Sequence, residues 1–116
     1  MSESPIDLSV LRGLESSTDP AFVQELLQIY LEDASRLVSA IRKGLADGEA
    51  RAVRIASHSM KSSSATVGAP RLSALAGEME AMAKADQLSG GEASLEALAV
   101  EFDRVQAALR MWPHGD

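Results

Sequence analysis

Apolar residues recur along this chain at spacings of three and four positions, which is the period of an amphipathic helix. No stretch alternates with the two-residue period of a half-buried strand. Clusters of glycine, proline and serine divide the pattern into five segments. We therefore predict an all-α fold in which a short helix, over about residues 6–14, precedes four longer helices. Gly13 lies near the expected end of the short helix, and Ser16, Ser17 and Thr18 form the expected connector.

The second helix has the clearest boundaries. Asp19 is a favourable N-cap, Pro20 fits the first helical position, and Asp47 with Gly48 is a typical stop signal. The three helices that follow are expected over about residues 49–67, 69–86 and 92–111. The apolar stripes consist of Phe22, Leu26, Leu27, Tyr30, Leu37, Ile41 and Leu45; Val53, Ala56, Met60 and Val67; Leu72, Leu75, Met79 and Met82; and Leu95, Leu98, Phe102, Val105 and Leu109.

Four helices joined by short loops are neighbours in space, so their stripes predict an antiparallel up-down-up-down four-helix bundle over about residues 19–111. The first helix would lie across this bundle as a lid, and residues 112–116 would form a frayed tail. The chain of 116 residues, 46% hydrophobic, is long enough for one core and leaves no room for a second domain. A single domain over 1–116 is expected.

Composition and charge exclude several classes of function. The chain has no cysteine, which excludes disulfides, zinc–thiolate sites and thiol catalysis. Its 17 acidic and 11 basic side chains give a net charge of −6, which argues against binding to a nucleic-acid backbone. No signal peptide and no apolar run long enough to span a membrane are present, so we expect a cytoplasmic protein. The initial Met and short tail favour a stand-alone domain.

The third helix presents a histidine away from the core. With His58 as zero on a wheel of about 100° per residue, the apolar positions fall on the opposite side. Within roughly 60° of His58 lie Arg51, Arg54, Lys61, Ser62 and Ala65, among others. A solvent-facing imidazole thus stands among three cations in an acidic protein. The stripe could be a solvated face, or it could bind an anion.

If the cations around His58 bind an anion, the chemistry of the site can be specified. A neutral imidazole is a competent nucleophile toward phosphorus, and the nearby cations would disfavour the protonated ring near neutral pH. Lys61, one turn after His58, could reach the oxygens of a phosphoryl group on the ring. Ser62 and Ala65 are small enough to let a partner approach. Ser63 and Ser64 are expected to serve helix packing, with their hydroxyls bonded to carbonyls four residues back, and phosphorylation of this serine run by a kinase is a weaker alternative.

The residues around His58 resemble the sequence signature of a known protein family. The run Ser57-His58-Ser59-Met60-Lys61-Ser62-Ser63-Ser64, with Gly68 and Ala69 ten and eleven positions after the histidine, resembles the signature of histidine-containing phosphotransfer (HPt) domains of multistep phosphorelays. The upstream run also resembles the family's second helix: Phe22, Glu25, Leu26, Leu27, Tyr30, Asp33, Leu37, Ile41, Asp47 and Gly48. The likeness spans roughly residues 19–80. The departures are Ser62 for the usual glycine, Ser57 for alanine and Met60 for leucine.

The resemblance implies a phosphorelay intermediate that is a monomer. His58 would be the phosphoacceptor and Lys61 the lysine beside the phosphoryl group. The partners would be a hybrid sensor kinase and a response-regulator receiver domain, whose aspartate and bound Mg²⁺ supply the rest of the chemistry, so that this chain needs no cofactor. Arg51, Arg54, Ser62 and Ala65 would contact the partner, with the cations steering its acidic surface.

Other functions receive less support. The chain has no glycine-rich nucleotide loop and no acidic cluster arranged for magnesium, so it is not expected to take phosphate from ATP. With His114 in the expected tail, no metal triad or nucleophile–base pair can be assembled around His58. The pairs Glu78/Glu80 and Glu101/Asp103 are interpreted as solvated faces, and Met60, Met79 and Met82 as core filler. The alternative function is a helical adaptor that binds a signalling partner without phosphoryl chemistry.

Overall fold

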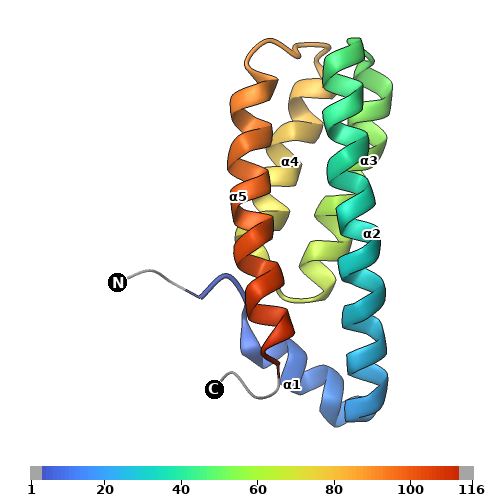
Figure 1. Ribbon diagram of the computed structural model, residues 1–116, viewed down its shortest axis with the longest axis vertical. Coiled ribbons are helices and arrows are strands. Elements are labelled where there is room, and N and C mark those ends of the chain that lie inside the picture. The colour runs from blue at the N-terminus through green and yellow to red at the C-terminus, as the bar shows by residue number, and fades with distance from the viewer. Residues whose placement is uncertain (1–3, 113–116) are drawn as a thin grey trace.

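The computed structural model describes residues 4–112, and every regular element in that part of the chain is a helix (Figure 1). The helices are α1 (Leu8–Ser17), α2 (Pro20–Asp47), α3 (Ala50–Thr66), α4 (Pro70–Lys84) and α5 (Gly91–Arg110). Helices α2 to α5 run alternately up and down around one core, with α3 and α4 as the most extensively packed pair. This arrangement confirms the predicted all-α antiparallel bundle, and the ends of α2 to α5 lie within two residues of those expected.

The predicted boundaries of α2 are confirmed in atomic detail. The Asp19 carboxylate accepts a hydrogen bond from the backbone N–H of Phe22 at 2.8 Å, and Pro20 occupies the first helical position. At the other end Gly48 adopts a left-handed conformation with φ of 70°, which glycine tolerates without a steric penalty. These signals set the length of α2, the longest of the helices.

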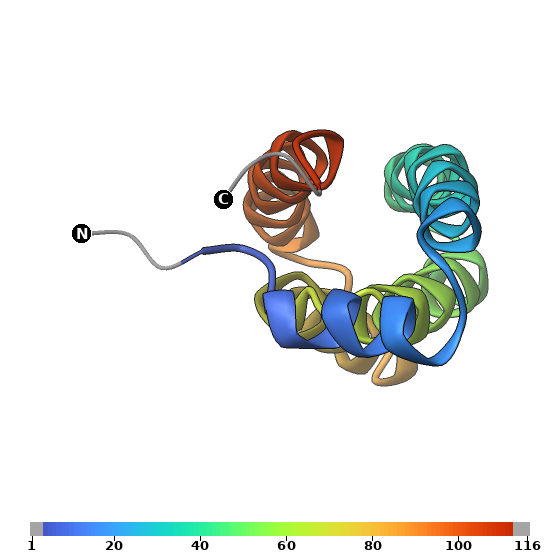
Figure 2. The ribbon, with the colours of Figure 1, turned by 90° about the horizontal axis from the view of Figure 1, so that it is seen from below.

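Helix α1 lies across the lower end of the bundle, beneath the turn between α3 and α4 (Figures 1 and 2). Its entry is tied to that turn, because the Asp7 N–H donates to the carbonyl of Gly68 at 2.7 Å. Leu11 is fully buried against the core. The helix occupies 8–17 rather than 6–14 because Asp7 caps its start, and the Thr18 N–H closes its last turn on the Leu14 carbonyl.

Residue 112, the first position of the expected frayed tail, is ordered against the core. Trp112 is half-buried and packs against the core, and its carbonyl accepts a hydrogen bond from Gln24 Nε2 at 3.2 Å. Residues 113–116, including His114, lie outside the described residues. The end of α5 is therefore fastened to the start of α2.

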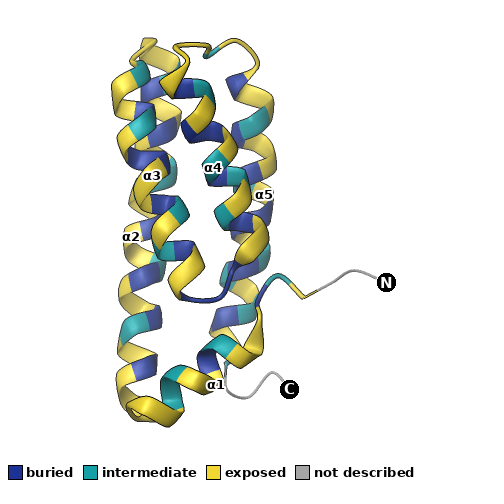
Figure 3. Ribbon diagram, turned by 180° about the vertical axis from the view of Figure 1, so that it is seen from behind, coloured by how far each residue is buried: buried dark blue, intermediate teal, exposed yellow. Residues whose placement is uncertain are grey.

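The buried faces of the helices match most of the predicted stripes (Figure 3). All five apolar positions expected in α5 are buried, and Met60 and Met79 are fully enclosed. Phe22 is the exception, because its side chain is 47% exposed at the edge of α2. Val23 and Ala34, which point to the centre of the bundle, are buried instead. Leu26, Leu37, Leu45, Leu75 and Met82 are half-buried.

The interpretation of Glu101 as a solvated residue is wrong. Its side chain is 4% exposed on α5, where it accepts a hydrogen bond from Arg104 Nη1 at 2.8 Å and lies 3.6 Å from Arg71 Nε on α4. Two arginines offset the cost of burying this carboxylate. Glu78 and Asp103 are exposed, as predicted. Glu101 thus contributes an ionic link between α4 and α5.

The close approach of α2 to α3 gives a first prediction. Gly44 is buried, and a Cβ atom added there would lie 2.7 Å from Cγ2 of the fully buried Val53. We expect Gly44→Ala to lower the free energy of unfolding by about 1–2 kcal/mol through overpacking, despite alanine's better helix propensity. Urea denaturation followed by circular dichroism measures the change. Gly13→Ala is the control, because a Cβ at Gly13 meets nothing within 4 Å. Equal or greater stability of Gly44→Ala would contradict this packing.

Candidate functional site

His58 projects from the middle of α3 toward solvent. Its side chain is 62% exposed, while Val53, Ala56 and Met60 on the other side of the helix are buried. The outward orientation predicted from the helical wheel is therefore confirmed. The imidazole is accessible to a second protein without any rearrangement of the core.

A carboxylate from α4 orients the imidazole. His58 Nδ1 lies 2.8 Å from Oε2 of Glu80, whose side chain is only 6% exposed. An ionised carboxylate can only accept hydrogen bonds, so Nδ1 carries the proton in this contact. In the neutral ring the lone pair then resides on Nε2. The geometry selects the tautomer in which the distal nitrogen carries the free lone pair.

Lys61 contacts the same carboxylate. Its Nζ lies 2.6 Å from Oε1 of Glu80, and Nζ of Lys84 lies 3.9 Å from Oε2. The hydrogen bond from Lys61 is the largest cause that lowers the pKa of Glu80, to about 2. Burial of the carboxyl group opposes this lowering of its pKa, and the hydrogen bond to His58 adds to it. Glu80 is consequently ionised at neutral pH.

Glu80 is the site residue that sequence reasoning missed. It was interpreted as part of a solvated face, and this is wrong because its carboxylate is enclosed between α3 and α4. The expectation that cations dominate the environment of His58 also needs correction, because the charged group in contact with the ring is an anion. Lys84, one turn after Glu80, was missed as well.

The other predicted site residues lie on the surface around His58. Arg51, Ser62 and Ala65 are exposed, and Arg54 is half-buried, all on the outward part of α3. Ile55, one turn before His58, is 50% exposed and was not predicted. These side chains form an accessible face of mixed character rather than an enclosed substrate pocket.

The hydrogen-bond partners of the serines around His58 differ from those predicted. Ser64 is buried and its hydroxyl lies 2.9 Å from the Tyr30 hydroxyl of α2, instead of bonding to a carbonyl four residues back. Burial raises the pKa of Tyr30 to about 12, although the hydrogen bond with Ser64 opposes this. The Ser63 hydroxyl donates to the carbonyl of Met60, three residues back, at 3.4 Å. Ser57 is fully buried, and its hydroxyl makes no hydrogen bond.

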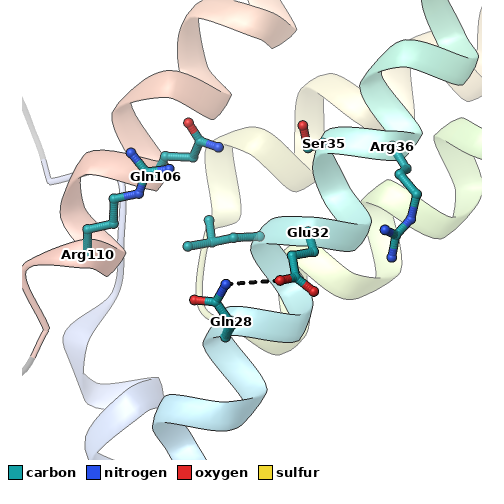
Figure 4. Close-up of a pocket in the computed structure, with 7 residues that line it drawn as sticks. Gln28, Glu32, Ser35, Arg36, Gln106 and Arg110 are labelled. Carbon is teal, nitrogen blue, oxygen red and sulfur yellow. Dashed lines mark hydrogen bonds between the residues drawn. The ribbon is translucent and has the colours of Figure 1, made fainter.

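Residues of α2 and α5 line a hollow of about 430 Å³ (Figure 4). In Figure 2 these two helices lie across the bundle from α3 and α4. In Figure 4 Gln28 and Glu32 of α2 face Gln106 and Arg110 of α5, and Gln28 Nε2 donates to Glu32 Oε2 at 3.0 Å. The hollow shares no residue with the site around His58. Among the described residues, no three histidine, aspartate or glutamate side chains are grouped so that they could hold a metal ion.

Comparisons with known proteins point to one family. The protein-family model for the Hpt domain matches residues 25–108 of this sequence. Histidine-containing phosphotransfer protein 2 of Arabidopsis thaliana is 26% identical over 103 residues, which cover 86% of this chain and 66% of that protein. The crystal structure of histidine-containing phosphotransfer protein B from Pseudomonas aeruginosa superimposes with a TM-score of 0.89 at 26% identity and covers 95% of each chain. No helix within residues 4–112 is sufficiently long and apolar to cross a membrane.

The buried carboxylate predicts a specific pH dependence of stability. Because the pKa of Glu80 is lowered from 4.5 to about 2 on folding, its ion pairs stabilise the fold above pH 4.5. This contribution is lost as the pH falls from 4.5 toward 2. We expect the free energy of unfolding of Glu80→Gln to fall less steeply than that of the wild type across this window. Urea denaturation at a series of pH values measures both slopes, and parallel slopes would contradict the lowered pKa.

Proposed function

Because the chain belongs to the Hpt domain family of phosphorelay intermediates in two-component signalling, we propose that His58 carries the phosphoryl group and exchanges it with the aspartate of a receiver domain. The observation that supports this assignment is the 2.8 Å contact between His58 Nδ1 and Glu80, which leaves Nε2 as the nucleophile on an exposed side chain. The chain spans 66% of the length of its Arabidopsis relative, so the proposal concerns this domain.

The transfer is an in-line displacement at phosphorus. The lone pair of His58 Nε2 attacks the aspartyl phosphate of the receiver, a P–N bond forms, and the P–O bond to the receiver carboxylate breaks. The ring becomes an N-phosphoryl imidazolium that keeps its proton on Nδ1. The ionised Glu80, 2.8 Å from Nδ1, stabilises the positive charge that develops there. Reversal of the same steps returns the phosphoryl group to a receiver.

Lys61 is proposed to bind the phosphoryl oxygens. It lies one turn after His58, and its ammonium group contacts the same Glu80 carboxylate as the ring, so the two side chains project from one side of α3. A cation at this position would offset the negative charge of the phosphoryl group. When Lys61 turns toward the phosphate, Lys84 remains beside Glu80 as a second cation.

The partner surface follows from the exposed residues around His58. Arg51 and Arg54 would steer the acidic face of a receiver domain, and the small side chains of Ser62 and Ala65 would admit it. The exposed side chain of Ile55 adds an apolar contact. The receiver is expected to bring its own Mg²⁺, and a hybrid sensor kinase is the second expected partner.

We further propose that this chain needs no cofactor, has no ATP site of its own, is a monomer and is located in the cytoplasm. The alternative function, an adaptor without phosphoryl chemistry, differs from the proposal in one observable property: it would not accept phosphate. The buried pairing of Glu80 with both His58 and Lys61 favours the relay, because an adaptor has no need of an oriented imidazole.

The phosphoacceptor is tested with His58→Gln. Phosphoramidate should place an acid-labile phosphoryl group on the wild type and none on the variant, because the nucleophilic nitrogen is absent. Phosphate-sensitive electrophoresis and intact-mass measurement detect the group. Circular dichroism is the control, and it should show an unchanged helix content because the side chain is 62% exposed. Phosphorylation of the variant at wild-type level would exclude His58 as the acceptor.

Lys61→Ala tests the role of the lysine. We expect slower transfer from a phosphorylated receiver, or a shorter lifetime of the phosphohistidine, because the phosphoryl charge loses its cation. Quench-flow and hydrolysis time courses measure the two rates. Lys43→Ala is the matched control, since Lys43 is exposed and pairs with Asp47 at 2.9 Å on α2. Rates equal to the wild type in both variants would reduce Lys61 to a surface charge.

A further inference from the structure

One face of α4 contacts Lys61 at three points, namely its backbone carbonyl, its aliphatic stem and its ammonium group. Ser73, Gly77 and Glu80 are spaced by four and three residues, so they lie in a row along that face. The Ser73 hydroxyl donates to the Lys61 carbonyl at 2.8 Å. A Cβ atom added to Gly77 would lie 3.3 Å from Cδ of Lys61, and Glu80 accepts from its Nζ at 2.6 Å. Backbone, stem and ammonium group of Lys61 are each held by a different residue of α4.

The absence of a side chain at Gly77 matters for the stem. The lysine side chain has four rotatable bonds and loses considerable rotamer freedom when its ammonium group is fixed. The aliphatic stem of Lys61 packs against the surface of α4 at Gly77. Glycine in the interior of a helix is unfavourable relative to alanine, so a packing reason is needed for its presence in α4. The bare backbone at Gly77 provides one, because any Cβ would press on the Lys61 stem.

We propose that Gly77 and Ser73 are positioning residues for Lys61, which set how its ammonium group is presented to the phosphoryl site. They touch neither the imidazole nor the expected position of the phosphate, and they act only through Lys61. The inference rests on the proposed function for its consequence in phosphotransfer, whereas the positioning itself can be observed without any phosphate.

The phosphate-free test is the titration of Glu80 in Gly77→Ala. The added methyl group should move the Lys61 stem off α4 and weaken its hydrogen bond to Glu80. The pKa of Glu80 should then rise by about one unit from its value of about 2, a tenfold change in proton affinity. Carboxyl NMR of the full chain measures this pKa. Gly13→Ala is the matched control, because it makes the same change in an open part of α1 and should leave Glu80 unaffected.

Ser73→Ala provides a second variant should Gly77→Ala fold poorly. Loss of the hydrogen bond to the Lys61 carbonyl should shift the pKa of Glu80 in the same direction. An unchanged pKa of Glu80 in Ser73→Ala and in a folded Gly77→Ala would overturn the proposal. A shift in Gly13→Ala as large as that in Gly77→Ala would also overturn it, because the effect would not act through the Lys61 stem.

The consequence for transfer is tested in two backgrounds. Gly77→Ala should slow transfer from a phosphorylated receiver severalfold in the wild type and have no further effect in Lys61→Ala, because the two residues act through one group. A Gly77→Ala effect that persists without Lys61 would overturn the positioning role. If the wild type never accepts phosphate, the proposed function fails, and the pKa of Glu80 still decides whether Gly77 and Ser73 position Lys61.

Discussion

The buried carboxylate of Glu80 between α3 and α4 is the constraint on which the site depends. An isolated carboxylate would be costly in this position, and the cost is offset only if cations and hydrogen-bond donors reach it. His58 and Lys61, one turn apart on α3, supply two of these partners, and Lys84 lies nearby on α4. The register between the two helices is thereby linked to the orientation of the imidazole. Stability and the orientation of the imidazole rest on the same carboxylate.

The remainder of the bundle keeps this pair of helices in place. The α3–α4 turn passes through Gly68, whose positive φ of 82° and close contact with Val10 leave no room for a side chain. Its carbonyl accepts the Asp7 N–H, so α1 braces the turn from below. The second buried carboxylate, Glu101, links α5 to α4 through Arg71. Helices α1 and α5 are therefore each fastened to the α3–α4 pair by a specific contact, and the site is built on rigid elements.

The sequence predicted the features that depend on one helix at a time. Asp19, Pro20 and Gly48 carry strong local signals, and the outward direction of His58 follows from the period of α3 alone. The predictions that failed concern features that depend on how two helices face one another. Glu80 lies about 40° from the buried Ala76 on a wheel of α4, at the edge of the buried arc, and an acidic residue that borders such an arc is a signal that was available. Its partners on α3 could not be assigned without the register between the helices. Phe22 was misplaced because hydrophobicity does not tell the edge of a stripe from its centre.

The most direct test of the account is the tautomer of His58 in the unmodified protein, measured by ¹⁵N NMR of the imidazole at a pH where the ring is neutral. The contact with Glu80 predicts a protonated Nδ1 and an Nε2 with the chemical shift of an unprotonated nitrogen. In Glu80→Ala, where the acceptor is absent, the two tautomers should mix. A proton on Nε2 in the wild type, or spectra unaffected by the loss of Glu80, would contradict the claim that this carboxylate prepares the nucleophile.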